Sequence, residues 1–143
     1  MNITINYEVL KNTPQDIIIR GDEVYFQHIL SELCHNALIY CKSGGIVSIN
    51  SKIKEGFLEI SIEDNGIGIT PENQSKVFDR FFRVDSYIDY SIPGIGLGLC
   101  VVKMLCDKMG YSIKLESKLG EFTRVTLGNL KIIIADNERT GDR

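Results

Sequence analysis

Two alternating segments joined by a short polar connection constrain the fold of this chain more than any other feature. Residues 46–53 (IVSINSKI) and 57–64 (FLEISIED) place apolar and polar side chains on opposite sides with a period of two, which is typical of half-buried strands. Gly56 lies in the connection between them. A β-hairpin is the simplest structure with this spacing, so we expect an antiparallel pair of strands here.

A long helix is predicted before this hairpin. Asp22 stands at an N-cap position, where a short polar side chain can accept a hydrogen bond from the first helical turn. The helix is expected to run for about five turns and to end near residues 41–45 (CKSGG). Its predicted core face consists of apolar residues spaced by three or four: Phe26, Leu30, Leu33 and Ala37.

The other segments show the same two periodicities. Further strands are predicted at residues 2–9, 17–19, 111–117 and 122–128. A second helix is predicted at residues 97–110, where Gly110 provides a natural stop. The apolar face predicted for this helix consists of Val101, Leu105 and Met109.

This order of elements predicts an α+β fold, a two-layer sandwich in which helices pack on one face of a mixed, mainly antiparallel sheet. Residues 1–130 are expected to form one domain, and residues 131–143 an edge strand or a frayed tail. The stretch from residue 65 to residue 96 is irregular apart from one predicted helical turn starting at Thr70-Pro71. A loop of this length in a compact domain is either functional or a sign that an element has been assigned wrongly.

Composition excludes several functional classes. The 143 residues carry a net charge of -3, which gives no field that would gather nucleic acid or acidic lipid. No apolar run reaches the roughly 18 residues of a membrane span, and the first residues lack a signal-peptide pattern. We therefore expect a cytoplasmic domain without direct membrane contact. Neither a CxxC pair nor zinc-ligand clustering is present, which favours free, buried thiols at Cys34, Cys41, Cys100 and Cys106.

One edge of the long helix groups three different chemistries. Glu32, Asn36 and Tyr40 follow one another at intervals of four residues and share a flank. This row is either a solvated flank or one wall of a site, and the helix alone does not decide between them. His28 and His35 fall on the outward face, which argues against both being metal ligands and against a catalytic pair with the residues of this flank.

The stretch EDNGIGI, residues 63–69, directly continues a predicted strand. Asp64 at the strand end can accept a hydrogen bond from a ligand amine, while Gly66 and Gly68 let a flat ligand approach the backbone. Taken alone, the same residues also suit a plain turn.

A second glycine set, residues 94–98 (GIGLG), precedes the second predicted helix. Backbone N–H groups and the helix dipole favour phosphate at such a position, although the pattern matches neither a Walker loop nor a Rossmann fingerprint. Between the two glycine sets, residues 77–93 interleave aromatics with Arg80 and Arg83. The arginines supply the positive charge that a triphosphate needs, whereas aromatics with arginine also suit a protein contact patch.

Taken jointly and in this order, the motifs resemble those of the catalytic ATP-binding domain of bacterial sensor histidine kinases, within the larger group that includes gyrase, Hsp90 and MutL. SELCHNALIY (31–40) resembles the N box of that family, EDNGIGI its first glycine box, VFDRFFRVD (77–85) its F box and GIGLGL (94–99) its second glycine box. LGEFT (119–123) is similar to its last loop. The resemblance covers about residues 2–128 and implies a Bergerat-type ATP-binding fold.

The resemblance implies a site for ATP and Mg²⁺. Asn36 would bind Mg²⁺, and Asp64 would accept a hydrogen bond from the adenine amino group. The implied catalytic residues are Glu32, Asn36, Arg80 and Arg83. The implied nucleotide-binding residues are Asn36, Tyr40, Asp64, Gly66, Gly68, Ile69, Phe81, Gly94, Gly96, Leu97, Gly98, Leu99 and Thr123.

The function implied by the resemblance is donation of the γ-phosphate of ATP to a histidine on a separate dimerisation domain, within a two-component signal-transduction system. We expect that domain to be absent from this chain and a response regulator to be an indirect partner. The isolated domain is expected to be monomeric, and its parent kinase either soluble or anchored in the cell membrane.

Departures from the family pattern keep other functions open. Ile39 stands where lysine is usual, and Pro93 and Phe122 stand where glycine is common, which leaves room for a degenerate nucleotide-binding module without catalysis. Glu32 occupies the position of the water-activating glutamate of gyrase-like ATPases, so ATP hydrolysis with Glu32 as general base is an alternative. An anti-sigma-factor serine kinase is a further alternative for a domain of this length.

Overall fold

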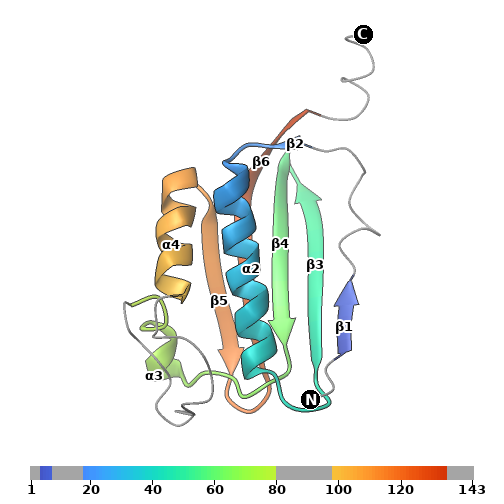
Figure 1. Cartoon of the computed structure of the whole chain (residues 1–143), viewed down its shortest axis with the longest axis vertical. Helices are drawn as coiled ribbons and strands as arrows, with labels where there is room; N and C mark the ends of the chain where they lie inside the picture. Colours follow the sequence, from blue (N-terminus) through green and yellow to red (C-terminus); the bar gives the residue numbers. More distant parts are fainter. Residues whose placement is uncertain (1–3, 8–17, 80–97, 135–143) are drawn as a thin grey trace.

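A computed structural model describes residues 4–7, 18–79 and 98–134, and the structural statements below concern these residues. The helices lie on one face of the sheet (Figure 1), and the predicted α+β sandwich is confirmed. The elements are β1 (Thr4–Tyr7), β2 (Ile18–Ile19), α2 (Glu23–Tyr40), β3 (Ile46–Lys54), β4 (Phe57–Asp64), α3 (Pro71–Gln74), α4 (Gly98–Met109), β5 (Ser112–Lys118) and β6 (Phe122–Ile134).

The sheet is mixed and mainly antiparallel, as predicted. Its strand order is β1-β3-β4-β6-β2, with β5 also paired to β6. The pair β1–β3 is parallel and the other pairs are antiparallel. The predicted hairpin connects β3 and β4, and its two turn residues, Glu55 and Gly56, have φ values of 54° and 86°. Two consecutive positive φ values are those of a type I′ turn, which matches the twist of the flanking strands.

Strand β6 is longer than the predicted strand at residues 122–128. It continues to Ile134, so residues 131–134 lie in the same strand, where Ile132 and Ile134 pair with β2. Asn129 takes a φ of 62° where the register between β4 and β6 shifts, and its side-chain amide donates to the carbonyl of Gly110 at 2.7 Å. Asparagine tolerates the left-handed conformation, so the strand passes this irregularity and goes on pairing.

The predicted start and length of α2 are confirmed, because Asp22 Oδ1 accepts a hydrogen bond from the N–H of Tyr25 at 3.0 Å. The predicted core face was only partly right. Ile29 is fully buried together with Leu33 and Ala37, whereas two predicted core residues, Phe26 and Leu30, are half-buried at its border. The reason is that α2 packs against both β4 and α4. Its most buried residues therefore follow one another at intervals of four, at Ile29, Leu33 and Ala37.

Helix α4 shows the same kind of shift. The fully buried residues are Val102 and Cys106, one position beyond the predicted Val101 and Leu105, which are half-buried. The helix ends where predicted, since Gly110 takes a φ of 74°. Cys41 and Cys106 are buried, Cys34 and Cys100 are half-buried, and all four are free thiols. In the described ranges, every helix is too short or too polar to cross a membrane.

Candidate functional site

Three strands end in polar side chains at the same edge of the helix-covered face. Along β4, the buried row Leu58, Ile60 and Ile62 continues into Asp64. The residue directly opposite Asp64 on β6 is Thr123, and the residue opposite Thr123 on β5 is Ser117. Directly paired residues in an antiparallel ladder point to the same face, so the apolar core gives way here to a carboxylate and two hydroxyls.

Asp64 is a buried carboxylate, with only 4% of its surface exposed. Its Oδ1 atom accepts a hydrogen bond from the backbone N–H of Gly66 at 2.9 Å. Burial raises the pKa of Asp64 to about 6, and the charge of Glu63 adds to this while the Gly66 hydrogen bond opposes it. At neutral pH the group is therefore mostly an anion in a poorly solvated place, which makes it a strong hydrogen-bond acceptor.

The first glycine box, residues 63–69, packs against the C-terminal end of α2. The N–H of Ile67 donates to the carbonyl of Tyr40 at 3.2 Å. A Cβ on Gly66 would lie 2.0 Å from that same carbonyl oxygen and 2.7 Å from Asp64 Oδ1, closer than real Cβ contacts. Only glycine therefore fits at residue 66 while the loop keeps this contact with the helix.

The other side of the same loop rests on the turn between β5 and β6. The carbonyl of Ile67 accepts a hydrogen bond from the N–H of Gly120 at 2.8 Å. Gly68 has a φ of 68°, and a Cβ there would lie 2.2 Å from the carbonyl oxygen of Lys118. Both the conformation and the space require glycine at this position, so the loop is held on two sides.

Asn65 is a structural residue that the sequence analysis did not single out. Its Oδ1 atom accepts a hydrogen bond from the N–H of Ile46 at 2.8 Å, and its own N–H donates to the Ile46 carbonyl at 3.2 Å. The thiol of Cys41 also points to Asn65 Oδ1 at 3.7 Å. The side chain therefore closes the end of the β3–β4 ladder and fixes the direction in which the glycine box leaves the sheet.

Ser117 and Gln74 were also missed, and they hold the end of the glycine box. The N–H of Ile69 donates to Ser117 Oγ at 2.8 Å. The side-chain nitrogen of Gln74 donates to the carbonyls of Ile69 at 2.9 Å and Ser117 at 3.0 Å. This network joins α3, the loop and β5 next to Thr123, the residue that stands opposite Asp64.

The edge of α2 that carries Glu32 and Asn36 faces the first residue of α4. A Cβ built on Gly98 would lie 2.8 Å from Glu32 Oε2 and 3.9 Å from the side-chain nitrogen of Asn36. His28 Nε2 lies 4.0 Å from Glu32 Oε1, while His28 and His35 are exposed as predicted. The structure thus brings Gly98, the first residue of α4, next to Glu32 and Asn36, which lie more than 60 residues earlier on α2.

The donor atoms along this edge suit a hard cation, and the neighbouring helix suits phosphate. Carboxylate and amide oxygens are ligands that Mg²⁺ accepts, and Glu32 and Asn36 supply one of each. The N-terminal N–H groups of α4, a helix of 12 residues, favour anions. Leu99 in its first turn packs against the core. The residues present therefore fit a magnesium-nucleotide.

Several predicted site residues lie outside the described ranges. These are Arg80, Phe81, Arg83, Gly94, Gly96 and Leu97, and their assignment stays a prediction. The described members of the set gather around two points: Asp64, Gly66, Gly68, Ile69 and Thr123 at the polar end of the sheet, and Glu32, Asn36, Gly98 and Leu99 between α2 and α4. Tyr40, the last residue of α2, joins the first group through its carbonyl oxygen, which accepts from the N–H of Ile67.

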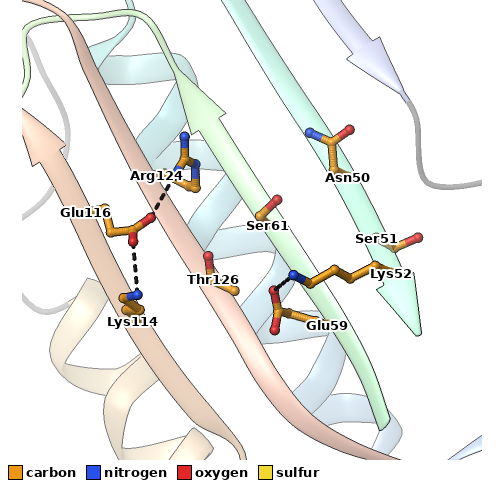
Figure 2. A pocket seen from close by; sticks show the side chains of 9 residues that line it. All are labelled: Asn50, Ser51, Lys52, Glu59, Ser61, Lys114, Glu116, Arg124 and Thr126. Carbon is orange, nitrogen blue, oxygen red and sulfur yellow. Dashed lines mark hydrogen bonds and ion pairs between the residues drawn. The ribbon is translucent and has the colours of Figure 1, made fainter. Parts of the chain in front are cut away.

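A hollow on the opposite face of the sheet is a poor candidate for this ligand (Figure 2). Its cations are paired: Lys52 lies 3.4 Å from Glu59, Lys114 lies 3.0 Å from Glu116, and Arg124 lies 2.7 Å from Glu116. Paired cations leave little charge for phosphate groups. The lining residues are Asn50, Ser51, Lys52, Glu59, Ser61, Lys114, Glu116, Arg124 and Thr126.

The model of a protein family described as histidine kinase-, DNA gyrase B- and HSP90-like ATPase matches residues 21–133 of the chain. Among curated proteins, the sensor-like histidine kinase SenX3 of Mycobacterium tuberculosis is 37% identical over 134 residues, which cover 92% of this chain and 33% of SenX3. The sensor histidine kinase WalK of Bacillus subtilis is 37% identical over 122 residues, which cover 83% of this chain and 20% of WalK. The chain therefore spans a third or less of these relatives.

Solved structures show the same fold. The mycobacterial sensor histidine kinase MprB superposes with a TM-score of 0.75 and 28% identity, covering 93% of this chain and 84% of the MprB chain. Full-length ShkA, solved in complex with AMPPNP, superposes with a TM-score of 0.76 and 25% identity, covering 93% of this chain and 27% of ShkA.

Proposed function

The chain belongs to the family of histidine kinase-, DNA gyrase B- and HSP90-like ATPases, and from this premise we propose that it is the ATP-binding catalytic domain of a sensor histidine kinase. In this function it binds ATP with Mg²⁺ and donates the γ-phosphate to a histidine on a separate dimerisation domain. The observation that carries the proposal is the buried Asp64 carboxylate at the polar end of the sheet, opposite Thr123.

Asp64 is suited to recognise the adenine base. Its Oδ1 atom is engaged by Gly66, which holds the carboxylate in one orientation and leaves Oδ2 for an amino group. Gly66 and Gly68 keep the loop free of side chains where the flat base would approach. Support comes from burial, because a hydrogen bond to a poorly solvated anion is stronger than one in water.

Asn36 and Glu32 are the residues proposed to hold Mg²⁺ and the phosphate end. Mg²⁺, when bound, neutralises charge on the phosphates. Asn36 offers a neutral ligand, and Glu32 beside it adds a carboxylate that faces Gly98. The first turn of α4 presents backbone N–H groups on the same side, so Gly98 and Leu99 are proposed to contact the phosphates together with the predicted Gly94, Gly96 and Leu97.

The proposed acceptor of the phosphate lies in another domain. The curated relatives in the comparison are named sensor histidine kinases, and this chain matches a third or less of their length, which supports a catalytic domain that works with a dimerisation domain. A response regulator would follow as an indirect partner. The predicted Arg80 and Arg83 are proposed to steer the γ-phosphate towards the histidine.

ATP hydrolysis is a second candidate, and one observation favours it. The Glu32 carboxylate lies beside the first residue of α4, where a general base would have to stand to act on water near a bound γ-phosphate. In this alternative Glu32 accepts a proton from the attacking water instead of assisting in phosphate positioning.

A transfer assay separates these functions. The chain is incubated with γ-labelled ATP and Mg²⁺, alone and with a dimerisation domain supplied in trans. Acid-labile, base-stable label on that domain supports the kinase, whereas release of free phosphate that is lost in Glu32→Gln supports hydrolysis. Label on a serine of an anti-anti-sigma partner would support a serine kinase. Bound ATP with neither label nor release would overturn catalysis and leave a binding module.

A further inference from the structure

We propose that Ser117 is a positioning residue that sets base specificity, because it fixes the Thr123 hydroxyl as a hydrogen-bond acceptor beside Asp64. Among the described residues, Asp64 and Thr123 then present two acceptor side chains to the base, which select a purine with a 6-amino group over one with a 6-oxo group. The inference rests on the proposed function, since it concerns the base of the nucleotide that the site binds.

Ser117 Oγ lies within hydrogen-bond distance of three groups. The N–H of Ile69 donates to it at 2.8 Å. The carbonyl oxygen of Phe122 lies 2.7 Å away and accepts from it. The hydroxyl of Thr123 lies 2.8 Å away, and from geometry alone either hydroxyl could be the donor of that pair.

Counting protons settles the direction of the hydroxyl pair. A serine hydroxyl has one proton and two acceptor lone pairs, and a carbonyl oxygen can only accept. If Ser117 donated to Thr123, two oxygens of Ser117 and Phe122 would face each other at 2.7 Å without a proton between them, which is repulsive. All three contacts are hydrogen bonds only when Ser117 donates to Phe122 and Thr123 donates to Ser117.

This direction decides what Thr123 can offer a ligand. Its single proton is used by Ser117, so its remaining capacity consists of lone pairs. Asp64 stands directly opposite Thr123 on the neighbouring strand, and an ionised carboxylate only accepts. In the described part of the chain, the donor to Asp64 is the Gly66 N–H on Oδ1. The edge therefore combines two acceptor side chains.

An acceptor-only edge favours an exocyclic amino group, which carries two N–H donors. The 6-oxo group of inosine or guanosine nucleotides places lone pairs against the lone pairs of Thr123. A site discriminates more strongly against a ligand that leaves polar groups unpaired or opposed than against a ligand that only lacks an apolar contact. Ser117 touches no ligand in this scheme; it acts by withholding the Thr123 proton.

The test compares the affinities of ATP and inosine triphosphate by calorimetry with Mg²⁺. The wild-type chain is expected to prefer ATP. In Ser117→Ala the Thr123 hydroxyl is free to rotate and donate to a 6-oxo group, so the preference for ATP should fall by roughly tenfold. Ser61→Ala, on the other face of β4, is the matched control and should leave the ratio unchanged. Thermal unfolding establishes that each variant is folded.

A double-mutant cycle makes the readout specific. In a Thr123→Val background, Ser117→Ala should no longer change the ratio of the two affinities, because the hydroxyl on which Ser117 acts is gone. Two results would overturn the inference: an equal loss of affinity for ATP and inosine triphosphate in Ser117→Ala, or the same change of the affinity ratio in the wild-type and Thr123→Val backgrounds. Either result would mean that Ser117 has only a structural role.

Thr123→Val alone keeps the proposal testable if Ser117→Ala does not fold. A valine removes one acceptor from the amino group and removes the opposed lone pairs from the oxo group, so ATP should weaken while inosine triphosphate does not. A parallel loss of inosine triphosphate would show that Thr123 donates and would refute the assignment. Failure of the wild-type chain to bind ATP at all would instead refute the proposed function.

Discussion

Asp64 and Thr123 lie directly opposite each other where β4 and β6 meet the polar end of the helix-covered face. The positions before Asp64 in the same row of β4 are buried isoleucine and leucine. A buried carboxylate in a row that is otherwise apolar opposes folding unless it is paired, and the one hydrogen bond from Gly66 compensates only in part. We interpret the buried Asp64 carboxylate as a residue that lowers the stability of the fold because it is needed to recognise a base.

This cost predicts a stabilising substitution. Because burial raises the pKa of Asp64 from 3.8 to about 6, the folded chain holds this proton more tightly than the unfolded chain between these pH values. Stability therefore falls as pH rises from about 4 to about 6 and stays lower above that. Asp64→Asn should raise the free energy of unfolding at pH 7.5, by up to about 3 kcal/mol.

The same variant should lose most of this advantage at pH 4, where Asp64 is protonated in the folded chain and about half protonated in the unfolded chain. Denaturant unfolding at the two pH values checks the prediction, with Asp107→Asn as a control. Asp107 lies in an exposed pair with Lys103 at 2.6 Å, and such pairs contribute little. Equal stability of wild type and Asp64→Asn at pH 7.5 would count against an ionised Asp64 in the fold.

Nucleotide affinity should depend on pH in the opposite sense. The amino group of adenine needs the ionised carboxylate as acceptor, so affinity is expected to be constant above about pH 7 and to fall below about 6. Calorimetric titrations of ATP into wild type and Asp64→Asn across this range separate Asp64 from the titration of ATP itself. The fall should be steeper for wild type, and identical profiles would contradict the prediction.

The glycine box provides a prediction about sterics. Gly66→Ala places a methyl group 2.0 Å from the Tyr40 carbonyl oxygen, and backbone on both sides must move. We expect a loss of about 2–4 kcal/mol in unfolding free energy. Gly44→Ala is the control without a clash, because Gly44 has open space around it and a φ of 73°, which Gly66 does not share, so this variant reports backbone strain alone at about 1 kcal/mol. Similar losses in the two variants would argue against the close contact.

The edge of α2 provides a prediction about transfer. Asn36→Ala should remove Mg²⁺-dependent phosphate transfer to a dimerisation domain while part of the affinity for ADP remains, because Asp64 is proposed to hold the base independently of Asn36. His35→Ala is the control on the same helix, since His35 is exposed and is expected to play no part. Full transfer activity in Asn36→Ala would exclude the metal role of this residue.

Periodicity in the sequence was sufficient for the elements but not for the centre of the core. The start of α2 at its Asp22 cap and the β3–β4 hairpin follow from local signals, so they could be predicted. Ile29 and Val102 were missed as the buried centres of their helices. Their positions depend on how α2 and α4 pack against each other, which a single helix pattern does not contain.

In the site, too, residues with a local signal were predicted and residues that depend on strand pairing were not. Asp64 and the two glycines were predicted from residue type, whereas Thr123 was included only through the family resemblance, and Ser117 was missed. A signal for Ser117 exists: along β5, Ile113 and Leu115 are followed in the same row by a serine, as the apolar row of β4 is followed by Asp64. Strand register brings these ends together. The register between two strands cannot be predicted from the sequence pattern of either strand alone.

The role of Asp64 is tested most directly by a calorimetric titration of the chain with ATP and Mg²⁺ at pH 7.5, for wild type, Asp64→Ala and Asp64→Asn. We expect saturable binding of one ATP to wild type. Asp64→Ala should abolish ATP binding and Asp64→Asn should weaken it at least tenfold, because the amino group loses its acceptor, which costs about 1–3 kcal/mol or more. Equal affinity of all three would contradict the assignment of Asp64 as the base-recognising residue.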